Sequence, residues 1–135
     1  MSIVLAHQKS SSHQLALEEA AKQAQLRKTS LVVIHVPEGV DVDVIEEQRN
    51  SVSAEITEGL QKLGLDELSW ALHVTTGEDV ADAILDSTAG ADAELLVIGA
   101  RRRSPVGKLF LGSVTQNLIL RADIPVLVVK GPKER

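Results

Sequence analysis

Residues 95–130 read LLVIGARRRSPVGKLFLGSVTQNLILRADIPVLVVK and contain two continuous apolar runs, at 95–98 and 126–129. Neither run alternates with polar residues, which is the pattern of a strand covered on both faces. Between them lie a glycine-opened basic loop (99–111) and a helical segment (112–121). Two buried strands flanking one helix predict a right-handed βαβ unit. The loop should then lie at the carboxyl edge of a parallel sheet, where open α/β sheets bind ligands.

The loop and the start of the helix have the composition of a phosphate site. Gly99 is expected to let the chain turn sharply off the strand, and Gly112 to let backbone approach a ligand closely. The first N–H groups of the helix have no partner inside it, and the hydroxyl groups of Ser113 and Thr115 add donors or a cap. Such an end attracts anions. In a chain of net charge -5, the same loop holds four cationic side chains, those of Arg101, Arg102, Arg103 and Lys108.

These residues resemble the signature of the universal stress proteins, which is Gly, two residues, Gly, nine residues, Gly, and then Ser or Thr. Gly99, Gly112 and Ser113 occupy three of the four fixed positions with the spacing intact, and Arg102 stands where the second glycine belongs. In ATP-binding members this loop cradles the triphosphate. The resemblance leaves two roles open for Arg102, which either obstructs a phosphate or holds one with its side chain.

The rest of the chain alternates short apolar runs with helical segments. Strands are expected at 3–6, at 31–36 and, less continuously and therefore nearer an edge, at 68–75. Helices are expected after an N-cap at Ser10, Ser11 or Ser12, from Asp41 to a stop at Gly64, and from 79 to 89.

Five strands and four helices in strict alternation predict an α/β fold, a doubly wound five-stranded parallel sheet. The length of 135 residues suits a single domain, with a polar tail at 130–135. The family resemblance covers essentially the whole chain. It implies strand order 3-2-1-4-5, helices on both faces, and a crevice between the first and fourth strands.

The resemblance also implies an ATP site, with Mg²⁺ as the accompanying ion. Its adenine end falls on Ala6, His7, Gln8 and Val36, and Gln8 replaces the Asp of the family. A Gln amide still donates and accepts, but it lacks the stronger charge-assisted hydrogen bond of a carboxylate. The phosphate end falls on Ile98, Gly99, Arg101, Arg102, Gly112, Ser113, Val114 and Thr115.

The four histidines are the natural candidates for metal ligands in this chain. His7 and His35 are expected near the carboxyl ends of neighbouring strands, so they should share the crevice and titrate near neutrality. Two histidines with no third ligand in local spacing make a poor metal site, and none is predicted. His13 and His73 are expected on the surfaces of a helix and of the sheet.

The amino-acid composition disfavours several classes of function. The chain has no cysteine and almost no aromatic residues, which disfavours disulfides, thiolate metal sites and base stacking on nucleic acid. No signal peptide or membrane-spanning run is recognisable, so a soluble, cytoplasmic protein without membrane contact is expected. The standard triphosphatase, hydrolase and metalloprotease motifs are absent.

Three functions stay open from the sequence. The first is a universal stress protein that binds ATP or a related adenine nucleotide as a regulatory ligand in a stress response, with little or no hydrolysis. The second is a member of the same fold that has lost ATP and acts as a homodimeric interaction module. The third is an enzyme of the wider adenine-nucleotide group, for which no catalytic residue is identifiable. A homodimer is expected through the last strand, Val126 to Val129, because an apolar edge strand invites a partner.

Overall fold

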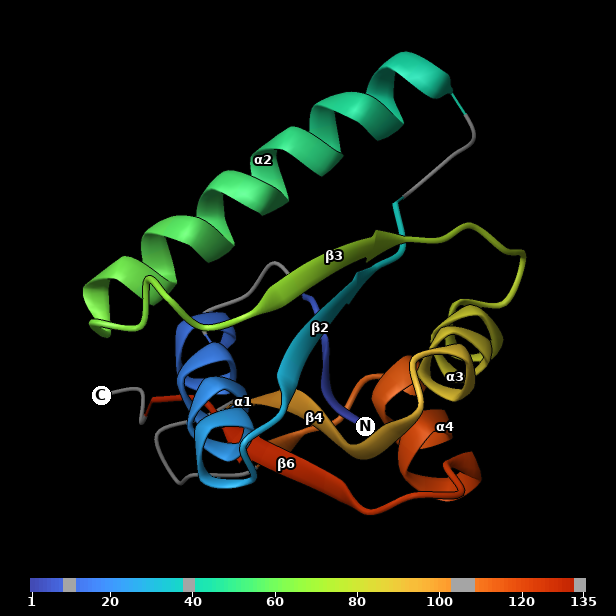
Figure 1. The fold of residues 1–135 in the computed structure, drawn as a ribbon. Helices are drawn as coiled ribbons and strands as arrows, with labels where there is room; N and C mark the ends of the chain where they lie inside the picture. The colour runs from blue at the N-terminus through green and yellow to red at the C-terminus, as the bar shows by residue number, and fades with distance from the viewer. Residues whose placement is uncertain (9–11, 38–40, 103–108, 133–135) are drawn as a thin grey trace.

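A computed structural model describes residues 1–8, 12–37, 41–102 and 109–132 (Figure 1). Arg103, Lys108 and the last three residues of the expected polar tail lie outside these ranges. The strands are β1 (Ser2–Ala6), β2 (Ser30–His35), β3 (Trp70–Val74), β4 (Ala93–Arg102), β5 (Leu109–Phe110) and β6 (Val126–Lys130). The helices are α1 (His13–Leu26), α2 (Val42–Lys62), α3 (Val80–Gly90) and α4 (Ser113–Arg121).

Five of the strands form the predicted parallel sheet. Their order is β3-β2-β1-β4-β6, which is 3-2-1-4-5 when the parallel strands alone are numbered. The predicted order and the edge position of the third strand are therefore confirmed. The additional short strand β5 pairs antiparallel with the end of β4, where the sequence predicted only a loop.

Helices cover both faces of the sheet, as predicted. Alternate residues of each strand point to opposite faces. Ile3, Leu5 and neighbouring strand residues pack with buried residues of α1 and α2, whereas Val4 and Ala6 belong to the core under α3 and α4. Because the central strands are buried on both faces, they consist of continuous apolar runs. Figure 1 shows α3 and α4 together on the side of the sheet away from α1.

Local signals explain where α2 begins and ends. The side chain of Asp41 accepts a hydrogen bond from the backbone N–H of Asp43 at 2.9 Å, which satisfies a donor that the helix cannot pair. At the other end Gly64 adopts a φ of 71°, the left-handed conformation that stops a helix and that glycine accepts without strain. Both boundaries were predicted.

Gly99 does not turn the chain off the strand, and this expectation was wrong. β4 continues past Gly99 to Arg102, where it pairs with β5. Close packing against a neighbouring residue requires a residue without a side chain at position 99. A Cβ at this position would lie 2.7 Å from Oγ and 3.2 Å from Cβ of Ser12, the N-cap residue of α1. The glycine therefore allows the start of α1 to approach the sheet.

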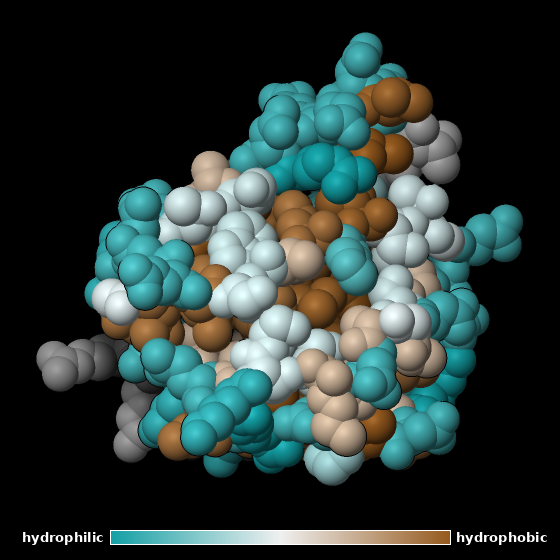
Figure 2. Space-filling model, in the orientation of Figure 1, coloured by the Kyte–Doolittle hydropathy of each residue, from teal (hydrophilic) through white to brown (hydrophobic). Residues whose placement is uncertain are grey.

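The amino-terminal part of α2 extends beyond the sheet (Figure 1). Its apolar residues Val42 and Val44 are exposed, whereas Val52, Ile56 and Leu60 are buried farther along the helix. Figure 2 shows apolar surface near this end of α2 and again at the centre of the same face, below the helix. Within the described ranges, no helix combines the length and the apolar character needed to cross a bilayer.

Candidate functional site

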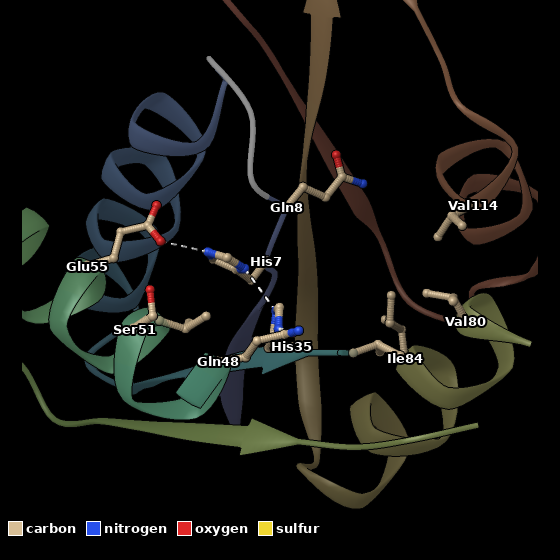
Figure 3. Close-up of a pocket in the computed structure, with 11 residues that line it drawn as sticks. His7, Gln8, His35, Gln48, Ser51, Glu55, Val80, Ile84 and Val114 are labelled. Carbon is tan, nitrogen blue, oxygen red and sulfur yellow. Dashed lines mark hydrogen bonds and ion pairs between the residues drawn. The ribbon is translucent and has the colours of Figure 1, made fainter. Parts of the chain in front are cut away.

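A pocket of about 570 Å³ opens at the carboxyl ends of β1 and β2, where the topology predicted a ligand. Its walls come from the ends of these two strands, from one face of α2 and from the first turns of α3 and α4 (Figure 3). The lining side chains are His7, Gln8, His35, Val36, Gln48, Ser51, Val52, Glu55, Val80, Ile84 and Val114.

Four of the predicted site residues line this pocket, namely His7, Gln8, Val36 and Val114. Thr115 lies directly behind them. Its hydroxyl accepts a hydrogen bond from Nε2 of Gln8 at 3.4 Å, and its side chain is buried. The structure thus brings the end of β1 and the start of α4 together, as the strand order predicted.

The other predicted residues do not line the pocket. Ala6, Ile98 and Gly99 are buried in their strands. Arg101 is exposed on β4, and the backbone of Arg102 pairs with Leu109 of β5. Gly112 is the N-cap of α4, so Ser113 is the first helical residue rather than the cap that the sequence suggested. Ser113 is exposed.

The sequence analysis missed the contribution of α2. Gln48, Ser51 and Glu55 line the pocket from one side of this helix, next to the buried residue Val52. Residues three and four apart share a helix face, so the polar positions beside the apolar stripe were a usable signal. Which other element this face contacts, however, depends on how α2 packs against the sheet.

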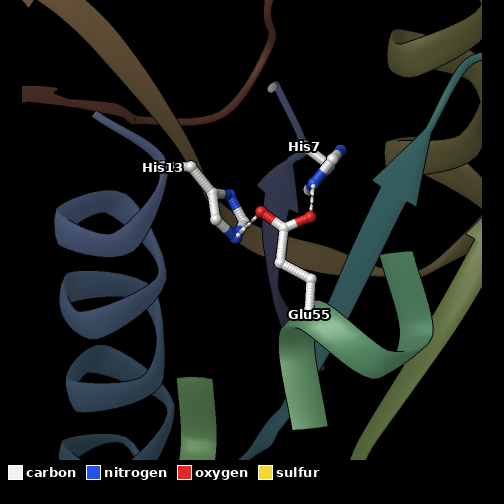
Figure 4. Close-up of side chains that lie close together, drawn as sticks. All are labelled: His7, His13 and Glu55. Atoms are coloured by element: carbon white, nitrogen blue, oxygen red, sulfur yellow. Dashed lines mark hydrogen bonds and ion pairs between the residues drawn. The ribbon is translucent and has the colours of Figure 1, made fainter. Parts of the chain in front are cut away.

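Three histidines and one carboxylate form a cluster at one side of the pocket. Figure 4 shows His7, His13 and Glu55, and Figure 3 shows His35 next to His7. Nε2 of His7 lies 3.2 Å from Oε2 of Glu55, and Nε2 of His13 lies 3.2 Å from the other oxygen, Oε1. On its opposite side, Nδ1 of His7 lies 3.1 Å from Nδ1 of His35. Nε2 of His35 in turn lies 2.9 Å from Oε1 of Gln48. The predicted meeting of His7 and His35 is confirmed.

His13 is buried, contrary to the expectation of a surface position, with 7% of its side chain exposed. It is the first residue of α1, and its ring packs edge-on against that of His7 with centroids 4.6 Å apart. Nε2 of His13 lies close to Glu55 but makes no hydrogen bond. The contact is therefore electrostatic.

Burial keeps His7 and His13 uncharged at neutral pH, so the expectation that His7 titrates near neutrality was wrong. Desolvation lowers the pKa of His7 from 6.5 to about 4, and the nearby His13 lowers it as well, while Glu55 acts in the opposite direction. Desolvation also lowers the pKa of His13, again against the influence of Glu55. Removing a charged imidazolium from water is costly, and one partly exposed carboxylate does not offset this cost for two rings.

The order of the parallel strands and the helices on both faces define an open, doubly wound α/β domain. A family profile described as the universal stress protein family matches residues 1–130. A universal stress protein of Mycolicibacterium smegmatis is 38% identical over 115 residues, which cover 85% of this chain and 86% of the relative. The chain belongs to the universal stress protein family.

Solved structures agree with this assignment. A universal stress protein from Archaeoglobus fulgidus superimposes with a TM-score of 0.80 at 33% identity, covering 96% of this chain and 98% of the other. A structure of a universal stress protein from A. fulgidus in complex with dAMP gives a TM-score of 0.76 at 28% identity, with the same coverage. That relative binds an adenine nucleotide.

Proposed function

We propose that this chain binds ATP or a related adenine nucleotide in the pocket between β1 and α4, as a regulatory ligand in a stress response. The main support is the hydrogen bond between Gln8, a residue of the predicted adenine end, and Thr115, a residue of the predicted phosphate end. This contact is what a single nucleotide site shared by the two sets of residues would require. The pocket volume of about 570 Å³ lies within the usual range of small-ligand sites, roughly 300–1,000 Å³. The dAMP complex of the A. fulgidus relative supports the same ligand class.

The chemistry of the lining fits a nucleotide with a flat base and a charged end. Val36, Val80, Ile84 and Val114 provide apolar surface for the base. The Gln8 amide offers both a donor and an acceptor to the base edge or the ribose. The amino-terminal N–H groups of α4 attract phosphate oxygens, and the cationic residue Arg101 lies on the strand that leads into the basic loop.

Little or no hydrolysis is part of the proposal. Among the side chains that line the pocket, Glu55 is the only carboxylate. Both of its oxygens already lie within 3.2 Å of histidine nitrogens. Glu55 is therefore poorly placed to activate water or to hold Mg²⁺ against a triphosphate. The nucleotide would act by occupancy rather than by turnover.

A thermal-shift titration tests this proposal. The purified chain, stripped of nucleotide, is titrated with ATP, ADP, AMP and GTP, each with and without Mg²⁺. Ligand at about 100 times its Kd should add roughly 2.7 kcal/mol, which raises the Tm of a domain of this size by several degrees. A saturable shift with adenine nucleotides and none with GTP supports the proposal. No shift at millimolar ATP contradicts it.

A second candidate function is a homodimeric interaction module that has lost ATP. The observation that favours it is the outer position of β6, whose residues Val126–Val129 are only half-buried at the sheet edge. The replacements at Gln8 and Arg102 point the same way. The variant Arg102→Gly separates the two roles of this arginine. Stronger ATP binding indicates an obstruction, and weaker binding indicates a phosphate ligand.

A further inference from the structure

The cluster at the side of the pocket has the donor set of a transition-metal site. His7, His13 and Glu55 each offer one ligand atom, and these atoms all lie within 4.8 Å of one another. In the sequence, no third ligand is recognisable near His7 or His35. Tertiary packing supplies that ligand, because it brings the first residue of α1 and the middle of α2 to the end of β1 (Figure 4).

Two of the separations are close to those of a tetrahedral zinc site. Zinc binds histidine nitrogen and carboxylate oxygen at about 2.0–2.1 Å, so two ligand atoms of a tetrahedron lie about 3.3 Å apart. Nε2 of His7 and Nε2 of His13 lie 3.2 Å from the two oxygens of Glu55. Because the two nitrogens face different oxygens and the three ligand atoms lie within 4.8 Å of one another, the side chains would have to rotate toward a common centre to hold one ion.

The hydrogen-bond chain behind His7 prepares it as a ligand. Oε1 of Gln48 can only accept, so Nε2 of His35 carries the proton at their 2.9 Å contact. In the neutral ring Nδ1 of His35 is then an acceptor, and Nδ1–H of His7 donates to it across 3.1 Å. This leaves a lone pair on Nε2 of His7, which faces a carboxylate oxygen of Glu55 at 3.2 Å.

In this arrangement a lone pair of the buried His7 faces a lone pair of the partly exposed Glu55 carboxylate. The two repel, and a cation between them removes the repulsion. Nε2 of His13 adds a third such atom, since it is the one buried side-chain polar atom in the described residues without a hydrogen-bond partner. A metal-ligating histidine commonly donates its second N–H to an outer acceptor, which fixes the tautomer. His35 and Gln48 supply such a chain for His7.

We propose that His7, His13 and Glu55 bind a divalent transition-metal ion of the zinc class, with a fourth coordination position open to the pocket. Two imidazoles and a carboxylate suit Zn²⁺ or Co²⁺ and disfavour Mg²⁺, which requires oxygen ligands. Three protein ligands leave one position for water or for a ligand atom. His7 and Glu55 both line the pocket, so that position is reachable from it.

The test is a calorimetric titration of the full chain, free of any affinity tag and stripped with a chelator, with Zn²⁺ and separately with Mg²⁺. No nucleotide is present, so the result is independent of the proposed function. One equivalent of Zn²⁺ should bind saturably, and Mg²⁺ should not compete. Co²⁺ should give the visible absorption of a four-coordinate site.

Four variants locate the ion. His13→Gln and Glu55→Gln keep the side-chain volume and should weaken Zn²⁺ binding at least about 100-fold, the upper end of the loss that follows from changing an outer partner. Gln48→Leu, which removes the acceptor behind His35, should weaken it about 10-fold. His73→Gln is the matched control, because His73 is exposed on β3. Circular dichroism and the metal-free Tm establish that each variant is folded.

Three results would overturn the proposal. The first is that the stripped wild-type chain binds no Zn²⁺. This result is expected if the Gln48 amide is rotated so that its NH₂ donates to His35, because Nε2–H of His7 then pairs with Glu55. Unchanged affinity in folded His13→Gln or Glu55→Gln places the ion elsewhere. Loss of binding in His73→Gln identifies adventitious binding at an exposed histidine.

Discussion

Nε2 of Gln8, at the end of β1, donates a hydrogen bond to Oγ1 of Thr115, in the first turn of α4, across 107 residues of sequence. The contact spans the gap between the first strand and the helix that follows the basic loop. It places the residue that replaces the family Asp beside the helix start that the signature motif predicts as the phosphate end. The residue at position 8 should therefore tune nucleotide affinity.

Gln8→Asp should raise the affinity for ATP. A charge-assisted hydrogen bond contributes about 1 kcal/mol more than a neutral one, which corresponds to roughly a fivefold lower Kd. Isothermal titration calorimetry measures the change. Gln61→Asp, at an exposed position of α2, controls for the added negative charge and should leave Kd unchanged. An equal or higher Kd in Gln8→Asp would show that this position does not contact the ligand.

Gly112→Val should abolish nucleotide binding. Gly112 is the N-cap of α4, so a branched side chain there would stand where phosphate must approach the first N–H groups. Gly90→Val is the matched control, because nothing lies within 4 Å of a Cβ built at Gly90. Thermal shifts with ATP compare the two variants. Wild-type affinity in Gly112→Val would move the ligand away from the start of α4.

Gly99→Ala should destabilise the fold by about 1–3 kcal/mol, the usual cost of forcing an extra carbon into a packed site. The new Cβ would meet the buried Ser12 at 2.7 Å, whereas Gly90→Ala adds its carbon to open space. Urea unfolding gives both values. The double variant Ser12→Ala/Gly99→Ala completes a cycle, and a coupling energy near zero would rule out the steric explanation.

Stability of the metal-free chain should fall as the pH drops from 6.5 toward 4. The folded-state pKa of His7, at about 4, lies below the ordinary value of 6.5. The unfolded chain therefore binds more protons in this window, and the stabilisation present above pH 6.5 is lost as the pH falls. Burial of His13 beside it acts in the same direction, while Glu55 and His35 face the same ring.

The full pKa shift of His7 corresponds to roughly 3 kcal/mol in the free energy of unfolding. Urea unfolding at several pH values in chelator measures it. The variant His7→Asn removes the titrating group and should flatten the pH dependence by a comparable amount, which separates this effect from that of the carboxylates. An identical slope in the variant and the wild type would contradict the assignment.

Val128→Pro should convert a dimer to a monomer if copies pair through β6. The N–H of Leu96 donates to the carbonyl of Pro125 at 3.0 Å. Main-chain groups alternate in direction along a strand, so Leu127 faces β4 and Val128 presents its N–H outward. A proline at 128 removes that donor without breaking the bonds to β4. Val128→Thr keeps the N–H and should remain dimeric in sedimentation. A monomeric wild type above micromolar concentration would exclude this interface.

The fold was largely readable from the sequence because its signals are local. Continuous apolar runs marked β1, β2 and β4, and the residues Asp41 and Gly64 marked the ends of α2. The errors arose where a local pattern had two physical causes. Glycine permits a turn, and the sequence therefore suggests one at Gly99. In the structure the small size of Gly99 instead allows Ser12 to pack closely against β4.

The pocket was only half predictable. Residues at the ends of β1 and β2 follow from the strand order, since parallel strands end at one edge. His13 and Glu55 come from helix faces, and a helix face carries no mark of which other element it meets. His13 and Glu55 lie next to His7 only because of the way in which α1 and α2 pack over the sheet.

Periodicity and glycine spacing determine the fold class, the five parallel strands and the family, because these depend on each segment's own preferences and on short-range geometry. The histidine–carboxylate cluster, its desolvation and the contact between Gln8 and Thr115 exist only in the folded chain. Burial and proximity between residues far apart in sequence are properties of packing, and packing sets both the protonation of His7 and the ligands gathered around it.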